Sequence, residues 1–506
     1  MIIGAGPVGL VLAIELGRRG VRCMLVERKS APQFLPKMER CNARTMEIFR
    51  RMGLAAKVRA AGLPAHVPMD VYIVRALDQP PLLHSPYPSV EEARRAINAC
   101  NDGSLPLEPY QLISQYTLEP LLKSVAEKGC LVRYGCAFES FEQDAAGVTT
   151  QTSAGPIRSK YLVGCDGGAS AVRHQLGIAL GGEADILRLR QALYRCDELF
   201  DRLPINGGPG KGRHYHVADE RSTFLIMQDS TRHWTLHAVV GEDREMAAQF
   251  EKTVGVPVKY EMLYVGEWKQ NLLLAERYGR GRVFLAGDAV HLMIPTGGLG
   301  MNSGVGDAID LAWKLEGTLR GWGGPHLLAS YEVERRQVGE RNVAASRYAS
   351  LGRRKWRSLW RNLDELVAVA RVEQPKSNEM IGAELGYRYE GSPLIADEPG
   401  GPEHPLRQYI PTTWPGARLP HVWLEGHTAI QDRIGHGYTL LRLGGSTQSI
   451  SSLGNAPFTV VDIPDAVARD LYGFDLILLR PDLHIAWRGN RLPADLGHFA
   501  AKVTGH

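Results

Sequence analysis

Cysteine is scarce in this sequence, and its placement excludes two classes of protein. The 506 residues contain seven cysteines, an odd number, with no CxxC pair, no zinc-binding spacing and none after Cys196. A zinc-ribbon fold needs closely spaced cysteine pairs, and a disulfide scaffold has an even, dense set of cysteines, so neither fits. We expect reduced thiols, most of them packed in the interior, at Cys23, Cys41, Cys100, Cys130, Cys136, Cys165 and Cys196.

Strong charge of one sign and long apolar runs are also missing. The formal net charge of +4 is small and dispersed, which argues against a nucleic-acid partner. No uninterrupted apolar run reaches the roughly 20 residues that cross a bilayer, and the apolar start has no charged region before it. We therefore expect a cytoplasmic enzyme with no membrane span, long enough for two or three domains.

A dinucleotide-binding fingerprint stands at the amino terminus. An apolar start, a GxGxxG motif, an amphipathic stretch and a second apolar run, Val21–Val26, follow one another as in a strand, helix and strand. The glycines let a pyrophosphate approach the helix, and the acid after the second run accepts from a ribose hydroxyl; a chance glycine turn is the minor alternative. Only Met1 to Ile3 precede the motif, so we expect a few natural residues to be missing upstream. The predicted cofactor-binding residues here are Gly4, Gly6, Gly9 and Glu27.

A second glycine-rich segment lies at residues 281–314. The apolar stretch Val283–Ala286 predicts a buried strand, and Asp288 presents a carboxylate at its carboxyl end, where a polyol could be hydrogen-bonded. The glycines that follow keep side chains away from the backbone, so a flat ring can lie at the start of the helix that holds Asp307 and Trp313. A purely structural strand-turn-helix is the alternative. The predicted cofactor-binding residues here are Asp288, Gly298, Gly300, Met301 and Asn302.

A third segment runs from Tyr161 to Arg173 and contains Asp166 followed by two glycines. One interpretation is that Asp166 and Arg173 form an ion pair that braces a loop. Taken together and in this order, however, the three segments resemble the FAD-dependent aromatic hydroxylases, the single-component flavoprotein monooxygenases typified by para-hydroxybenzoate hydroxylase and phenol hydroxylase. The resemblance implies that Asp166 lies near both FAD and the nicotinamide coenzyme.

The resemblance implies a monooxygenase that hydroxylates a phenolic or related aromatic substrate. Non-covalently bound FAD would be reduced by NADPH or NADH and react with O2 to a C4a-hydroperoxide, while the protein excludes water and orients the ring. The chain has no second dinucleotide fingerprint, as expected for a family in which the coenzyme visits a shared cleft. The alternatives are an FAD-binding oxidoreductase of the same fold without hydroxylase activity, such as a reductase or halogenase-like enzyme, and a non-catalytic scaffold stabilised by FAD. The WxWxIP motif expected of a flavin halogenase is absent.

The resemblance also assigns roles outside the three segments. It places Arg44, at the start of a helix, against the FAD, and Gln115 against the ribityl chain and pyrophosphate; each also fits as a surface or capping residue. Lys37 stands near the point where the best-studied members use an arginine. Because lysine is a point charge and not a fork, the mobile flavin-contacting arginine of those members does not carry over.

Strand-like runs between residues 214 and 237 are predicted to roof the substrate pocket, with alternate residues facing one side. We nominate Tyr215 and His216 as catalytic partners of the phenol hydroxyl, and Pro295 as part of the oxygen site. His214 and His216 also raise the possibility of a metal site. No further carboxylate or cysteine pattern supports it, so we predict no metal.

These patterns predict an α/β protein. A Rossmann-like FAD-binding domain comprises residues 1–70, 105–180 and 276–345, with an inserted β-sheet substrate-binding domain at 71–104 and 181–275 and a helical connection and linker at 346–395. Residues 396–506 resemble the thioredoxin-like C-terminal domain of phenol hydroxylase and aromatic polyketide hydroxylases. Without a cysteine this domain cannot perform thiol redox chemistry, so we expect a structural or subunit-interface role, compatible with a homodimer. Its predicted elements are Tyr438–Leu443, Phe458–Ile463, Ala466–Tyr472, Leu476–Leu479 and His484–Arg488.

Overall fold

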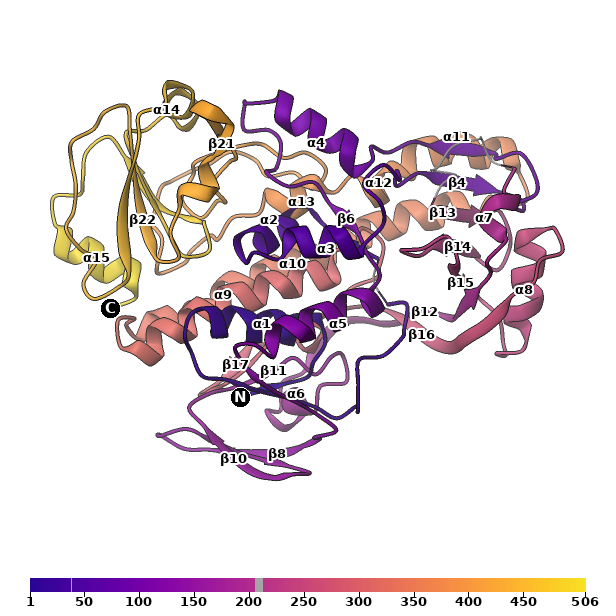
Figure 1. Cartoon of the computed structure of the whole chain (residues 1–506), viewed down its shortest axis with the longest axis horizontal. Coiled ribbons are helices and arrows are strands. Elements are labelled where there is room, and N and C mark those ends of the chain that lie inside the picture. The colour runs from indigo at the N-terminus through magenta and orange to yellow at the C-terminus, as the bar shows by residue number, and fades with distance from the viewer. Residues whose placement is uncertain (38, 205–212) are drawn as a thin grey trace.

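A six-stranded sheet carries the three glycine-rich motifs (Figure 1). The computed structural model describes residues 1–37, 39–204 and 213–506. The amino-terminal fingerprint, Asp166 and Asp288 follow the carboxyl ends of parallel strands that are neighbours in this sheet, so the chain brings the motifs together at one edge. The strand order is β17 (Gly279–Arg280), β18 (Val283–Leu285), β11 (Leu162–Gly164), β1 (Ile2–Ile3), β2 (Met24–Glu27) and β7 (Leu131–Tyr134), with β17 antiparallel to β18.

Helix α1 (Pro7–Arg18) packs against α5 (Gln115–Ala126) and α9 (Gly300–Arg320). It begins after Gly6, whose backbone is extended, because Pro7 has its φ already set for the first helical position and needs no hydrogen-bond acceptor there. Its interior side is apolar and belongs to the main hydrophobic core of the chain. The predicted helix holding Asp307 and Trp313 is confirmed as α9.

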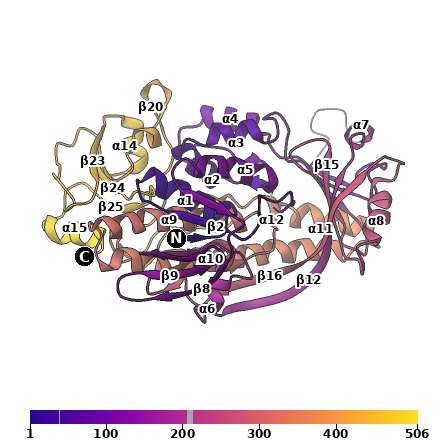
Figure 2. The same ribbon diagram turned by 60° about the horizontal axis from the view of Figure 1, so that its bottom comes forward.

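An eight-stranded sheet unites segments that are far apart in the sequence. Strand β4 pairs in parallel with β13, so residues from 71–104 and from 181–275 share one sheet. Two long neighbours, β12 and β16, run side by side through it (Figure 2). The strand order is β19 (His291–Leu292), β16 (Glu261–Ala275), β12 (Leu180–Arg195), β15 (His233–Ala238), β14 (Phe224–Met227), β13 (His214–Val217), β4 (Val71–Val74) and β5 (Leu83–Ser85).

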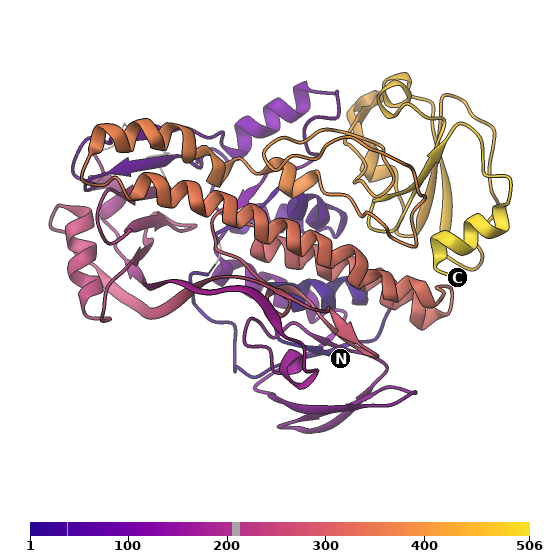
Figure 3. The ribbon, with the colours of Figure 1, turned by 180° about the vertical axis from the view of Figure 1, so that it is seen from behind.

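One long helix, α10 (Pro325–Arg357), reaches from beside the carboxyl-terminal part to the eight-stranded sheet (Figure 3). Its 33 residues span about 50 Å at 1.5 Å per residue. Helix α10 continues through residue 346, where we predicted that the helical connection begins, and its buried side extends without interruption to Trp356. Trp356 packs with Ile73 and Leu83 of the sheet, which fixes the end of α10 near the substrate-binding strands.

The carboxyl-terminal part is a four-stranded sheet with two helices. The predicted hairpin at residues 478–488 is confirmed, and the predicted strands and helix lie within a residue of their observed bounds. Strands β22 and β23 are parallel, and the other two pairs are antiparallel. The sheet order is β23 (Phe458–Ile463), β22 (Tyr438–Leu443), β24 (Leu476–Leu479) and β25 (Ile485–Gly489), with helices α14 (Ala466–Tyr472) and α15 (Leu496–Thr504).

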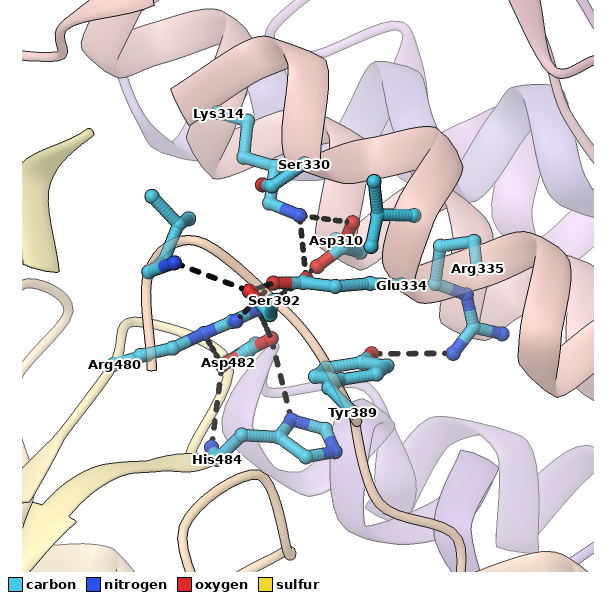
Figure 4. Close-up of polar contacts among 12 residues, drawn as sticks. Asp310, Lys314, Ser330, Glu334, Arg335, Tyr389, Ser392, Arg480, Asp482 and His484 are labelled. Carbon is cyan, nitrogen blue, oxygen red and sulfur yellow. Dashed lines mark hydrogen bonds and ion pairs between the residues drawn. The ribbon is translucent and has the colours of Figure 1, made fainter. Parts of the chain in front are cut away.

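Buried charges join this sheet to α9 and α10 (Figure 4). The buried guanidinium of Arg480 lies 2.6 Å from a carboxylate oxygen of Glu334 on α10 and 3.0 Å from one of Asp310 on α9. It also lies 2.7 Å from Asp482, and Lys314 Nζ donates to Asp310 and Glu334 at 2.7 and 2.6 Å. Buried charges are tolerated only when their partners are complete, so this cluster fixes the carboxyl-terminal part to the two helices.

All seven cysteines are free thiols, and no helix within the described ranges is long and apolar enough to cross a membrane.

The remaining elements are short. The other strands are β3 (Arg40–Cys41) with β6 (Gln111–Leu112), β8 (Phe138–Gln143) with β9 (Val148–Thr152) and β10 (Gly155–Ser159), and β20 (Trp423–Leu424) with β21 (Thr428–Ala429). The other helices are α2 (Ala43–Arg51), α3 (Ala55–Ala61), α4 (Val90–Ala99), α6 (Ala171–Gln175), α7 (Leu199–Arg202), α8 (Glu245–Val254), α11 (Leu363–Glu373), α12 (Pro375–Asn378) and α13 (Ile381–Leu385), with short 3-10 turns η1 (Gly287–Ala289), η2 (Glu425–His427) and η3 (Ile430–Arg433).

Candidate functional site

A cavity of about 550 Å³ is lined both by the loops at the carboxyl ends of the six-stranded sheet and by side chains of the eight-stranded sheet. It therefore collects motifs that lie almost 300 residues apart in the chain. Three predicted site residues, Gly9, Arg44 and Tyr215, are not among its lining residues. The predicted site residues that do line it are Gly4, Gly6, Glu27, Gln115, Asp166, His216, Asp288, Pro295, Gly298, Gly300, Met301 and Asn302.

The three fingerprint glycines differ in what a side chain at each position would meet. Gly4 has φ +102°, and a Cβ there would lie 2.4 Å from the carbonyl oxygen of Cys165. A Cβ at Gly9 would lie 2.0 Å from the carbonyl oxygen of Gly4, so Gly9 allows α1 to approach the turn and has no direct contact with the cavity. A Cβ at Gly6 would meet nothing within 4 Å. The space in front of Gly6 is open at the amino terminus of α1, where a pyrophosphate is stabilised by free N–H groups.

The three carboxylates predicted to bind the cofactor line the cavity and differ in their hydrogen-bond partners. Glu27 accepts from the backbone N–H of Ala5 at 2.9 Å and of Lys29 at 3.0 Å, so its position is fixed. Asp166 Oδ2 accepts from the N–H of Val172 at 3.2 Å, while its buried Oδ1 has no partner among the described residues. Burial raises the pKa of Asp288, against the opposing charge of His291. A buried acceptor without a partner fits a ligand hydroxyl, as the ribityl chain or a ribose of FAD would supply.

The alternative of an ion pair between Asp166 and Arg173 is contradicted. Arg173 Nη1 instead donates to the carbonyl oxygens of Gly168 and Ala289, both at 3.0 Å. The arginine therefore ties the third motif to the loop that carries Asp288. The Oδ1 oxygen of Asp166 therefore remains available to a ligand in the cavity.

Asp307 on α9 holds the loop from which Asp288 projects. Its Oδ2 accepts from the N–H of Gly287 at 3.0 Å and lies 2.8 Å from His291 Nε2, and its Oδ1 accepts from Arg335 Nε at 2.8 Å. Burial alone would raise the pKa of Asp307, but the charges of Arg335 and His291 outweigh it and lower the pKa. Asp288 is thus oriented by a buried ionised carboxylate behind it.

Asn302 lines the cavity, yet its amide is used to brace the glycine loop. Its Oδ1 accepts from the N–H of Asn42 at 3.0 Å and from Thr45 Oγ1 at 2.7 Å. Its Nδ2 donates to the carbonyl oxygens of Gly298 at 2.6 Å and Arg40 at 3.2 Å. The side chain of Asn302 therefore holds the loop, which leaves the backbone of that loop to meet a ligand.

The predicted role of Arg44 is wrong, and Arg40 takes the place beside the loop. Arg44 lies in the first turn of α2 on the side that faces the carboxyl-terminal part, where its Nη2 donates to the carbonyl oxygen of Asp482 at 3.0 Å. Arg40 lines the cavity and donates to the carbonyl oxygen of Gly297 at 3.0 Å. Lys37 lines the cavity too.

The nomination of Tyr215 as a phenol partner is also corrected. Side chains alternate along β13, so the neighbours of His216 must point to the opposite face of the sheet. Tyr215 is fully buried in the second hydrophobic core, together with Trp234 and Leu225. His214 and His216 line the cavity, and the described residues include no cluster able to hold a metal ion.

His216 can donate a hydrogen bond into the cavity, as its partners and its protonation state show. Arg357 Nη2 donates to His216 Nδ1 at 2.8 Å. Burial, together with the charges of Arg353 and Arg357, lowers the pKa of His216 well below its usual value, so the ring is neutral. With Nδ1 accepting, the single proton of the neutral ring is on Nε2.

Several lining residues were missed in the sequence. They come from segments without a recognisable motif, such as the end of α10 and α12. The packing of Trp356 brings the end of α10 to the sheet. A signal for two of them existed, since Gln191 and Trp268 lie on the long alternating strands predicted for the substrate sheet. The missed residues named here are Arg40, Gln191, Trp268, Arg353 and Asn378.

The comparisons with known proteins agree with this arrangement. A family model described as "FAD binding domain" matches residues 1–346, and one described as "Aromatic-ring hydroxylase, C-terminal" matches residues 412–506. The "FAD-dependent monooxygenase apdD" of Emericella nidulans is 31% identical, over 100% of this chain and 90% of its own length. The rebeccamycin biosynthetic enzyme RebC with reduced flavin is 30% identical with a TM-score of 0.89, over 100% of this chain and 98% of its own. Aklavinone-11 hydroxylase, solved with FAD and aklavinone, is 28% identical with a TM-score of 0.83, over 99% of this chain and 98% of its own.

Proposed function

The chain belongs to the FAD-dependent aromatic-ring hydroxylases, and from this premise we propose that it hydroxylates a phenolic or related aromatic compound with O2 and NAD(P)H. One observation carries the proposal. The same cavity is lined by the FAD motifs and by the side chains of the eight-stranded sheet, so a cofactor ring and an aromatic substrate can share one enclosed space. Aklavinone-11 hydroxylase, a similar enzyme, was solved with FAD and aklavinone bound together.

The lining residues fit FAD. We propose that its pyrophosphate lies at Gly6, that Glu27 and Asp166 bind ribose or ribityl hydroxyls, and that Asp288 binds the same polyol chain. Bound FAD supplies the oxygen-activating chemistry, which no protein side chain can supply. Pro295 and the loop of Gly298 and Gly300 would then exclude water from the reacting atoms.

We propose NAD(P)H as the reductant and no separate coenzyme domain, because the chain has a single dinucleotide fingerprint. Glu27 follows the strand of that fingerprint and does not distinguish NADH from NADPH. Steady-state rates with each coenzyme at equal concentration decide between them.

We also propose that the carboxyl-terminal part has a thioredoxin-like topology. Its sheet order β23-β22-β24-β25, with one parallel pair at β22 and β23 and an antiparallel hairpin at the other edge, supports this assignment. The part has no cysteine, so the proposed role is structural. Size-exclusion chromatography with light scattering tests whether that role includes a homodimer interface.

The function is tested with purified protein loaded with FAD. We expect NAD(P)H-dependent O2 uptake that rises with a phenolic substrate and matches the amount of hydroxylated product. O2 uptake that yields only hydrogen peroxide for every compound in a broad phenol panel indicates a reductase or oxidase of the same fold. A yellow protein that consumes no O2 under any of these conditions indicates a non-catalytic scaffold.

A further inference from the structure

The guanidinium of Arg353 lies at the end of the cavity that the eight-stranded sheet lines, and it has no counterion within ion-pair distance among the described residues. Arg353 on α10 lines the cavity, its Nε is buried, and none of its nitrogens has a hydrogen-bond or ion-pair partner among the described residues. Burial lowers the pKa of Arg353 to about 10, which leaves it protonated at neutral pH. A buried cation costs free energy unless an anion or several acceptors face it.

Glu39, the one carboxylate that raises the pKa of Arg353, is already paired with His214 and Arg213. Glu39 Oε1 lies 2.9 Å from His214 Nε2, and its Oε2 lies 3.6 Å from Arg213 Nη2. The charges of His214 and Arg213, opposed by burial, lower the pKa of Glu39 to about 2. Met38 and residues 205–212, outside the described ranges, contain no aspartate or glutamate that could serve instead.

The groups around Arg353 add donors and further positive charge. Arg357 donates to the carbonyl oxygen of Ser222 at 2.7 Å and to His216 Nδ1, and it has no carboxylate within ion-pair distance in the described structure. The proton of His216 is therefore on Nε2, which has no partner among the described residues. The lining histidine His237 accepts from Trp268 Nε1 at its Nδ1, at 3.1 Å, and its Nε2 lies 3.5 Å from Gln191 Nε2. This end of the cavity offers N–H groups and a surplus of positive charge.

We propose that the substrate is an anionic aromatic compound whose oxyanion, a carboxylate or an ionised ring hydroxyl, binds between the Arg353 guanidinium and the Nε2–H of His216. The inference rests on the proposed hydroxylase function and deepens it by naming the substrate class. A planar guanidinium matches a carboxylate with two parallel hydrogen bonds, which fixes the orientation of the ring as well as its affinity. Arg353 then selects acids over neutral aromatics of the same shape.

The test uses the FAD-loaded enzyme and a panel of hydroxybenzoates and hydroxynaphthoates, each paired with its methyl ester. Binding is measured through the change that each compound causes in the absorbance of the bound flavin. The variants are Arg353→Gln, which removes the charge, Arg353→Lys, which keeps it, and Arg354→Gln, which removes a neighbouring exposed charge on the same helix.

We expect the wild type to bind at least one acid more tightly than its ester, and Arg353→Gln to weaken that acid roughly 10- to 100-fold while the ester is unchanged. Arg353→Lys should recover part of the loss, and Arg354→Gln should match the wild type. An ester that binds only above the pKa of its own ring hydroxyl, and loses this binding in Arg353→Gln, identifies the ionised hydroxyl as the bound anion and also supports the proposal.

At a pH at which the ring hydroxyls are neutral, equal affinity of acids and esters in the wild type overturns the proposal, as does failure of every compound to bind both there and above the pKa of its ring hydroxyl. At that lower pH, an equal loss for acid and ester in Arg353→Gln assigns the residue to packing and overturns it too. The two proposals fail separately. Coupled hydroxylation of phenols that Arg353→Gln leaves unchanged contradicts the anion site and keeps the hydroxylase function. Arg353-dependent binding of acids without O2 uptake supports the anion site and contradicts the hydroxylase function.

Discussion

Replacement of Arg480 by methionine tests how the carboxyl-terminal part is attached. In the wild type this side chain makes hydrogen bonds to Glu334, Asp310 and Asp482, with donor-acceptor distances between 2.6 and 3.2 Å, and it is fully buried. Methionine fills similar volume without charge. The substitution leaves three buried carboxylates to share Lys314 and His484.

Removal of one partner from a buried charge cluster costs about 3–5 kcal/mol, because the remaining charges stay desolvated and unpaired. We therefore expect Arg480→Met to lower the free energy of unfolding by that amount at neutral pH. The deficit should shrink as the pH falls. The orphaned carboxylates have folded-state pKa values raised above their unfolded values, so the native variant binds more protons than the unfolded chain and gains relative stability with acid.

The assay is urea unfolding followed by circular dichroism between pH 5 and 8, with Arg442→Met as the matched control. Arg442 lies on β22 of the same sheet and pairs with Asp462 at 2.7 Å on an exposed surface, so its loss should have little effect. Equal unfolding midpoints for the two variants would refute the reasoning. A deficit that does not depend on pH would contradict the uncompensated-charge explanation and favour simple loss of packing.

The remaining predictions concern the cofactor, the tail and the coenzyme. Asp288→Ala should weaken FAD binding by about 1.5–3 kcal/mol in equilibrium dialysis, and unchanged binding would mean that FAD binds elsewhere. Acid precipitation should release all flavin from the wild type, and flavin that stays with the precipitate would mean that it is covalently bound. Truncation after residue 411 should expose the core side chains Trp313 and Leu327 and cause aggregation; a soluble truncate that binds FAD but is not reduced contradicts a structural tail. A true substrate should speed anaerobic flavin reduction by orders of magnitude, because the single cavity must admit the coenzyme and later exclude water; equal rates with and without it refute gating.

The elements that the sequence predicted well are those whose local pattern is sufficient. The three glycine motifs require particular backbone geometry, as at Gly4 and Gly9, where a Cβ would collide with neighbouring backbone. The tail strands are short apolar runs between turn residues, and their predicted bounds match the structure closely. Strand alternation likewise predicted that one face of the substrate sheet lines the cavity.

The errors arise where the outcome depends on packing between distant segments. Adjacent residues of a strand face opposite sides of the sheet, so Tyr215 cannot face the cavity when His216 does. Arg40 and Arg44 are separated by one helix cap, and only the position of the carboxyl-terminal part decides which of them faces the cavity. Arg353 has no motif at all. Its role depends on where a 33-residue helix ends.

We propose that one cavity holds FAD and an aromatic ring so that an oxygen atom passes from O2 to the ring. Turnover of the FAD-loaded enzyme with NAD(P)H under isotope-labelled O2, followed by mass spectrometry of the product, tests this claim most directly. We predict a hydroxylated aromatic product that carries one labelled oxygen atom from O2. A product whose new oxygen comes from water, or NAD(P)H oxidation with no oxygenated product for any aromatic acid or phenol tested, would contradict the account.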